Sequence, residues 1–174
     1  TLGLATALFF LLAATKTNGS VTLYGNVDVR QVDIGFRVYG KITEMPFEEG
    51  DFVASGDFMA CIDPQPYADQ VEKAYAQLQA AQFSLANAEQ IFARRQELVG
   101  EGGVSQEDYE NAKTARDVAI EMVKEAQASL GVAKTDLRNT KAYCPADGTI
   151  LTRVREPGTV VLQGEPVYTL SLIS

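Results

Sequence analysis

Three residues near the middle of the chain, Arg94, Leu98 and Ser105, have types and a spacing that suit binding to another protein. Arg94 and Leu98 are four residues apart, so they share one face of a helix. The heptad positions beside them are Arg95 and Val99, so we expect Leu98 to lie off the helix seam and to be exposed. An exposed apolar side chain beside an arginine is typical of protein contact surfaces. Ser105 opens the sequence Ser-Gln-Glu-Asp, a pattern that caps the start of a helix. A plain helix cap for Ser105 and a solvated charge near Glu97 for Arg94 are the alternative interpretations.

The residue types argue against catalysis. The chain has no histidine, so it lacks the commonest general base and the commonest metal ligand. Its two cysteines, Cys61 and Cys144, are too far apart in sequence for a CxxC metal or redox motif. The formal net charge of −8 argues against a nucleic-acid partner, which would call for a basic face. We therefore predict no enzyme, no metal and no cofactor.

Two segments of the chain resemble each other at a constant offset of 108 residues. The matched positions are Gly40 and Gly148, Ile42 and Ile150, Gly50 and Gly158, Val53 and Val161, Gly56 and Gly164, and Ile62 and Leu170. Each copy alternates short apolar strands with turns that need glycine, and the predicted turn glycines are Gly50, Gly56, Gly158 and Gly164. Neither copy has enough strands for a core, so we expect both to combine into one sandwich of about eight short strands.

A helical pattern occupies the sequence between the two copies. Apolar residues recur in steps of three and four from Val71 to Val99, and again from Tyr109 to Thr140. Three glycines within four residues separate the two arms. Each arm has about 35 residues, or roughly 50 Å at 1.5 Å per residue. Because both arms return to the same sandwich, they must fold back as an antiparallel hairpin with its tip near residues 100–104.

The predicted fold is therefore α+β. A split β-sandwich is formed by residues 20–63 and 143–174, and a long antiparallel coiled-coil hairpin is inserted at residues 64–142. The apolar run at the N-terminus is shorter than the roughly 20 residues that a spanning helix needs. We interpret residues 1–15 as the end of an N-terminal membrane anchor, and a signal-peptide h-region is the alternative. Both interpretations place the rest of the protein outside the cytoplasm.

This arrangement resembles the periplasmic adaptors, or membrane fusion proteins, of the HlyD/AcrA type. The split domain resembles a biotinyl-lipoyl domain. The segment KAYCPADGTIL resembles the family's T-x-I-x-A-P-x-D-G sequence, with Ala142 and Cys144 as departures. Arg94, Leu98 and Ser105 fit the family's R-x3-L-x6-S motif at the hairpin tip. The segment LYGNVDVRQVDIGFRVYGKI further resembles adaptors that are paired with ABC exporters.

The resemblance implies a protein of the periplasm, anchored in the inner membrane by its N-terminus. It implies that the tip contacts a TolC-type outer-membrane channel, and that the second partner is an inner-membrane transporter, with the ABC type favoured over the RND type. Several copies, six by analogy with the family, would pack their hairpins side by side into a tube. We expect the family's β-barrel and membrane-proximal domains to lie outside this chain.

The sequence is also compatible with two other functions and with one disulfide bond. A membrane-anchored coiled-coil scaffold without a transport role is one alternative. A carrier domain with a swinging lipoyl or biotin group is another, but it needs a lysine at a tight turn, and the tip sequence GEGGVS has none. Cys61 and Cys144 could face each other across adjacent strands, and an exported location would permit a disulfide. Two buried free thiols are favoured over this bond, because cysteine packs as a small apolar residue.

Overall fold

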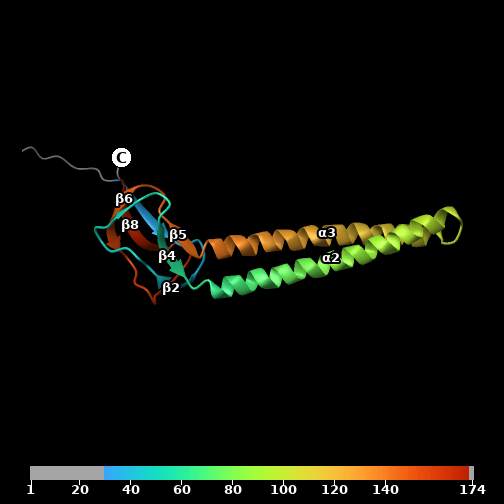
Figure 1. Cartoon of the computed structure of the whole chain (residues 1–174), viewed down its shortest axis with the longest axis horizontal. Helices are drawn as coiled ribbons and strands as arrows, with labels where there is room; N and C mark the ends of the chain where they lie inside the picture. Colours follow the sequence, from blue (N-terminus) through green and yellow to red (C-terminus); the bar gives the residue numbers. More distant parts are fainter. Residues whose placement is uncertain (1–29, 173–174) are drawn as a thin grey trace, which may run out of the picture.

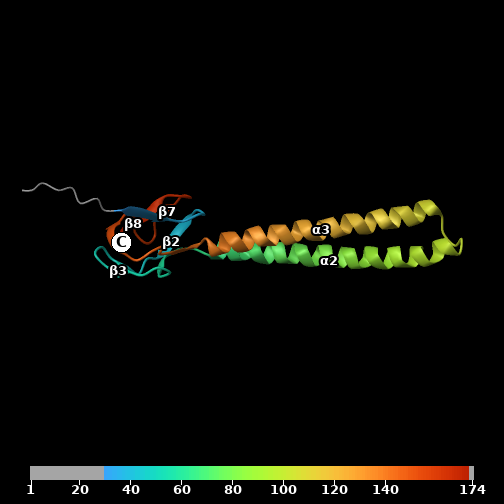
Figure 2. The ribbon, with the colours of Figure 1, turned by 90° about the horizontal axis from the view of Figure 1, so that it is seen from above.

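The computed structural model describes residues 30–172. It consists of a β-sandwich from which two long helices extend side by side (Figures 1 and 2). This is the predicted α+β fold, a split sandwich with an inserted helical hairpin. The predicted anchor at residues 1–15 lies outside the described residues.

The described strands form two antiparallel sheets of four strands each. In sheet order, the first is β1 (Gln31–Gly35), β8 (Pro166–Leu172), β6 (Gly148–Arg153) and β3 (Phe52–Val53). The second is β5 (Lys141–Tyr143), β4 (Phe58–Ile62), β2 (Gly40–Glu44) and β7 (Val160–Val161). Each sheet therefore takes two strands from each half of the sequence. Neither half can form its sheet alone.

The two halves pair their strands in the same register. Ile42 in β2 lies opposite Ile62 in β4, and Ile150 in β6 lies opposite Leu170 in β8. Both pairs of strands then carry a register shift at matching positions. The sequence repeat is therefore a structural repeat, and the sandwich has approximate two-fold symmetry.

The four predicted turn glycines all have a positive φ, at 91° for Gly50, 91° for Gly56, 94° for Gly158 and 80° for Gly164. A side chain at such a φ is strained, which explains why glycine stands at these turns in both copies. The N–H of Gly50 donates to the carbonyl of Ile150, and the N–H of Gly158 donates to the matching carbonyl in the other half. The turns therefore link the two halves as well as reversing the chain.

The core lies between the two sheets and draws on both halves. Its fully buried large side chains are Phe36, Ile42, Val53, Met59, Ile62, Ile150, Val161, Val167, Tyr168 and Leu170. Burying each such apolar side chain contributes about 1.5–3 kcal/mol. The Tyr168 hydroxyl finds a partner inside, because it donates to the carbonyl of Phe47 at 2.9 Å.

The hairpin consists of α2 (Gln65–Gly100) and α3 (Gln106–Arg138). Their 36 and 33 residues agree with the predicted length of about 35. The heptad positions predicted for both arms are all buried or half-buried, and the buried ones include Ala74, Ala112, Ala119 and Ala133. Small side chains there allow the two helices to approach closely, so the hairpin is a thin rod.

Both feet of the hairpin are tied to the sandwich. At the first foot, the Tyr67 hydroxyl donates to the carbonyl of Tyr39 at 2.6 Å. At the second, the buried Thr140 donates through Oγ1 to the carbonyl of Leu137, and its own carbonyl accepts the N–H of Ile62. The second half of the sandwich begins at Lys141, two residues earlier than predicted, because this contact draws the chain into β5 directly after the helix.

Cys61 and Cys144 are two buried free thiols, as favoured from the sequence, and no disulfide joins them. Cys61 lies opposite Lys141, whereas Cys144 donates its N–H to the carbonyl of Asp57. The two cysteines are thus offset by four residues along the sheet, or roughly 13 Å at 3.3 Å per residue. That distance is about twice what a disulfide spans between Cα atoms.

The repeat offers a matched pair of substitutions. A Cβ added at Gly148 would lie 2.5 Å from the backbone oxygen of Ser171, whereas one added at the equivalent Gly40 would meet the flexible end of the Ile62 side chain at 2.8 Å. We expect Gly148→Ala to lower the free energy of unfolding by about 1–3 kcal/mol and Gly40→Ala to lower it less. Denaturant unfolding of the two variants measures this, and a larger loss for Gly40→Ala would contradict the packing described here.

The thiols give a second prediction. Burial raises the pKa of both Cys61 and Cys144, so little reactive thiolate forms at neutral pH. We expect a thiol reagent at pH 8 to label the native protein about ten-fold or more slowly than the unfolded protein. The exposed substitution Ser129→Cys serves as the control for rapid labelling. Native thiols that react as rapidly as this control would contradict the burial.

Candidate functional site at the hairpin tip

The chain reverses at the tip between Gly100 and Gln106 (Figures 1 and 2). The carbonyl of Leu98 accepts N–H groups from Glu101 at 3.3 Å and from Gly103 at 2.9 Å. Gly102 has a φ of 73°, which an L side chain rarely adopts. The glycine cluster therefore makes the predicted turn, and the last turn of α2 holds it in place.

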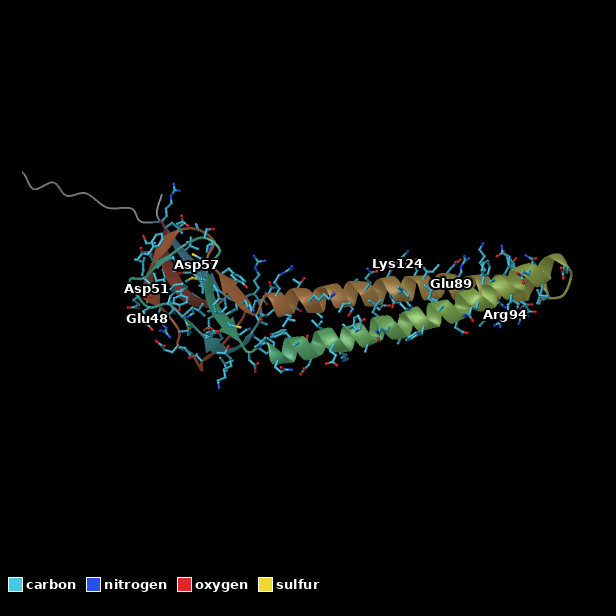
Figure 3. The ribbon with its side chains drawn as sticks, in the orientation of Figure 1. Glu48, Asp51, Asp57, Glu89, Arg94 and Lys124 are labelled. Carbon is cyan, nitrogen blue, oxygen red and sulfur yellow. The ribbon has the colours of Figure 1, made fainter. Side chains whose placement is uncertain are left out.

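Arg94 and Leu98 form an exposed pair on α2 beside this turn. The Leu98 side chain remains 41% exposed although it lies against Gly103. Ile91 and Arg95 join the pair in lining a shallow hollow of about 420 Å³. Figure 3 shows Arg94 close to the far end of the hairpin. The exposure predicted for Leu98 is thus confirmed, and an apolar side chain with a cation beside it is offered to solvent at the tip.

Ser105 caps α3. Its hydroxyl accepts the N–H of Asp108 at 3.1 Å and donates to the carboxylate of the same residue at 2.7 Å. The capping interpretation is therefore correct, and it satisfies a backbone donor that the helix leaves free. Ser105 is also exposed, at the start of the arm opposite to the one that carries Arg94 and Leu98. The capping role does not remove it from the tip surface.

A cluster below the tip, which the heptad pattern alone did not predict, is formed by Phe92, Tyr109 and Arg116 at seam positions. The rings of Phe92 and Tyr109 lie 5.6 Å apart between centroids, and the Arg116 guanidinium lies 4.2 Å from the centre of the Phe92 ring. Such a cation–aromatic contact contributes about 0.5–1 kcal/mol at an exposed site. The cluster joins the two helices just below the turn. Aromatic residues at heptad positions of both arms, at similar distances from the glycines, were the available signal.

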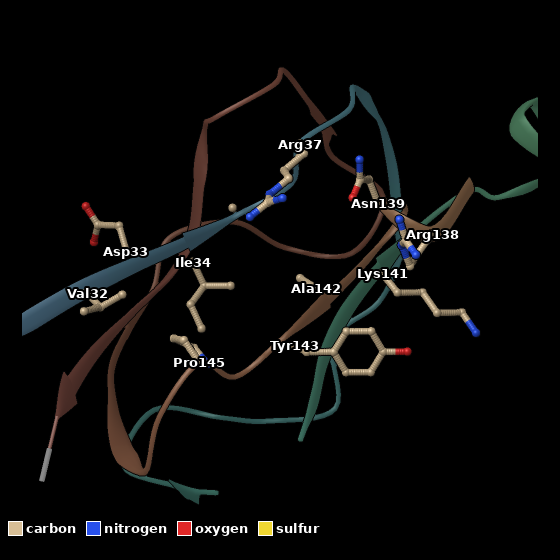
Figure 4. A pocket seen from close by; sticks show the side chains of 11 residues that line it. Val32, Asp33, Ile34, Arg37, Arg138, Asn139, Lys141, Ala142, Tyr143 and Pro145 are labelled. Carbon is tan, nitrogen blue, oxygen red and sulfur yellow. The ribbon is translucent and has the colours of Figure 1, made fainter. Parts of the chain in front are cut away.

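A second hollow, of about 420 Å³, lies on the sandwich between the edge strands β1 and β5 (Figure 4). Its apolar lining includes Ile34 and Ala142, which occupy equivalent positions in the two halves. Arg138 and Lys141 add exposed positive charge beside it. Within residues 30–172, no group of three or more His, Cys, Asp or Glu could hold a metal ion.

Comparison with known proteins decides what this hairpin is. Residues 70–140 match the family described as the RND MFP alpha-helical hairpin domain. This stretch, somewhat less than half of the chain, is similar to the helical hairpin of membrane fusion proteins. This confirms the resemblance to periplasmic adaptors that the sequence showed.

The curated relatives of this chain are named as membrane proteins. A UPF0194 membrane protein of Yersinia pseudotuberculosis is 31% identical, over 90% of this chain and 64% of its own length. One of Citrobacter koseri is 29% identical, over 91% of this chain and 63% of its own length. The chain thus spans slightly less than two thirds of these relatives. Within the described residues no helix has both the length and the apolar character needed to cross a membrane.

Three solved structures have the same fold. MacA from Actinobacillus actinomycetemcomitans is 25% identical with a TM-score of 0.65, covering 83% of this chain and 52% of MacA. A putative efflux transporter from Bacteroides eggerthii is 25% identical with a TM-score of 0.62, covering 90% of this chain and 49% of its own. A MacA–MexA chimera that contains the Pseudomonas aeruginosa MexA α-hairpin is 30% identical with a TM-score of 0.56, covering 83% and 48%.

The cap at Ser105 is testable apart from any partner. We expect Ser105→Ala to lower the free energy of unfolding by about 1 kcal/mol, because Asp108 loses the acceptor for its N–H. Ser105→Asn should retain most of the stability, since asparagine caps helices about as well as serine. Denaturant unfolding followed by helix content measures both. Equal stability for wild type and Ser105→Ala would show that the cap contributes nothing.

Proposed function

We propose that this protein is a periplasmic adaptor subunit of a multi-component efflux or secretion system. It bridges an inner-membrane transporter to a TolC-type outer-membrane channel, which its hairpin tip contacts. The protein connects and conducts, and no catalytic step is part of the proposal. The observation that carries it is the exposed Arg94–Leu98 pair at the far end of a long two-helix rod.

The shape of the molecule supports a bridging role. Each helix is roughly 50 Å long, so the tip surface lies far from the sandwich. Both feet are hydrogen-bonded to the sandwich, and the Phe92 cluster joins the helices near the tip. A rod held at both ends keeps the orientation of its tip relative to its base. That is what a contact between components in two membranes requires.

The tip offers chemistry suited to another protein. Leu98 supplies apolar area, and the Arg94 guanidinium supplies donors for carboxylates or backbone carbonyls of the partner. Ser105 lies across the turn with its hydroxyl already oriented by Asp108. These are the three positions that fit the R-x3-L-x6-S motif, and all three lie in the part of the hairpin nearest its tip.

The remaining partners follow from the family. We propose that the N-terminus anchors the protein in the inner membrane, which agrees with the name of its curated relatives. The segment from Leu23 to Ile42 favours an ABC transporter as the inner-membrane partner, whereas the family described for the hairpin favours an RND pump. We further propose a homo-oligomer, with six copies by analogy with the family.

Photo-crosslinking tests the tip. A photoreactive residue at the exposed Gln106, beside Ser105, should capture a TolC-type channel when the full-length protein is expressed in cells. Arg94→Asp should abolish the capture, because it reverses the charge at the contact. Lys73→Asp makes the same reversal on α2 about 30 Å nearer the sandwich and should leave the capture intact. Crosslinks to no other protein, with normal expression, would overturn docking at the tip and favour a membrane-anchored scaffold.

A further inference from the structure

The middle of α2 is unusual for a helix that faces solvent. No charged residue occurs between Ala74 and Ala88, although the outer faces of surface helices are normally charged. Phe83 lies at the heptad position farthest from the α2–α3 seam, and its side chain is 76% exposed. It is the most exposed large apolar side chain in residues 30–172. Covering this charge-free face would require no charge to lose its water.

The outer face of α3 has a hollow that fits such a side chain. Val118 is 48% exposed and Met122 is 52% exposed, and together they supply its apolar floor. Asp117, Glu121 and Glu125 form part of its rim. The hollow has a volume of about 620 Å³. We call it the α3 hollow; it faces away from α2, because Arg116, Ala119 and Val123 occupy the seam.

Phe83 and the α3 hollow are at the same height on the rod. Ala74 packs in one cluster with Ala133, and Phe92 contacts Tyr109 nearer the tip. Phe83 is halfway between Ala74 and Phe92, and the α3 hollow is halfway between their two partners on α3. The helices run side by side over this whole length (Figures 1 and 2). The projecting side chain and the hollow therefore lie level with each other on opposite edges of one hairpin.

We propose that Phe83 of one copy inserts into the α3 hollow of a second copy of this chain. Each copy carries Phe83 on one edge of its hairpin and the α3 hollow on the opposite edge. The same contact can therefore repeat from copy to copy, and it forms a ring when the rotation between neighbours adds up to a full turn. The charge-free face also suits the acidic rim, because its amides at Gln79, Gln82 and Asn87 can donate to carboxylates without like-charge repulsion. The inference rests on the proposed function for one point, that neighbouring hairpins stand on one membrane with their tips in the same direction.

Disulfide trapping tests the height match while leaving Phe83, Val118 and Met122 unchanged. Gln90 follows Phe83 by one heptad on the same face, and Thr114 lines the α3 hollow at the corresponding height. In the full-length protein in cells, Gln90→Cys with Thr114→Cys should give a ladder of dimers and larger species under mild oxidation. Each single variant should give about ten-fold less dimer, because neither position meets its own copy. The native Cys61 and Cys144 are buried and stay unreactive.

Two matched variants complete the test. Gln90→Cys with Ala128→Cys places the second thiol on the same face of α3, but two heptads or about 21 Å nearer the sandwich, and should give no ladder. Adding Phe83→Gln to the Gln90→Cys, Thr114→Cys pair should abolish the ladder, whereas Tyr75→Gln, which changes another exposed aromatic of α2, should not.

The experiment is performed in cells that lack the outer-membrane channel, so a failure of tip docking does not affect it. A ladder from the first pair alone, lost with Phe83→Gln, supports the contact. Equal yields from the Thr114 and Ala128 pairs would contradict the height match. A dimer from Gln90→Cys alone would show that two α2 faces meet each other. No ladder, or a disulfide to a different protein, would overturn the proposal.

Discussion

The structure depends on the exchange of strands between the two halves of the sandwich. Each sheet takes two strands from the segment before the hairpin and two from the segment after it, so the core closes only when both are present. That arrangement brings Asp63 and Thr140, the two ends of a long insertion, to neighbouring places on one rigid base. The helices need no other constraint to become antiparallel neighbours. The small β-sandwich thus determines the direction in which the whole helical rod extends.

The α2–α3 hairpin extends this rigid geometry away from the sandwich. A seam of small and apolar residues holds α2 and α3 close together, and the contacts among Phe92, Tyr109 and Arg116 join them again below the turn. A hairpin of only two helices buries just one stripe of each, so most of its surface is available for other molecules. That surface differs from place to place: it is cationic and apolar at Arg94 and Leu98, uncharged on α2 between Ala74 and Ala88, and apolar with an acidic rim on α3. Each region suits a different contact at a different height.

Structural roles and the proposed binding role coincide at the tip. Ser105 is a helix cap and also part of the exposed apex, and Leu98 packs against Gly103 while much of its side chain faces solvent. A turn this short has few residues, and the same side chains must close it and present its surface. A binding motif can therefore overlap a capping motif without conflict.

By itself the sequence determined what depends on local periodicity and on repetition. The spacing of glycines and apolar residues was sufficient for the split sandwich, the heptad seam, the tip and the exposure of Leu98, because turn geometry and helix periodicity act over a few residues. The strand register and the heights along the rod depend on which distant segments pair, so only the tertiary structure decided them. It separated Cys61 from Cys144 by roughly 13 Å, moved Lys141 into β5, assembled the Phe92 cluster and set Phe83 level with the α3 hollow. One-residue changes in pairing alter such relations while leaving every local pattern in the sequence intact.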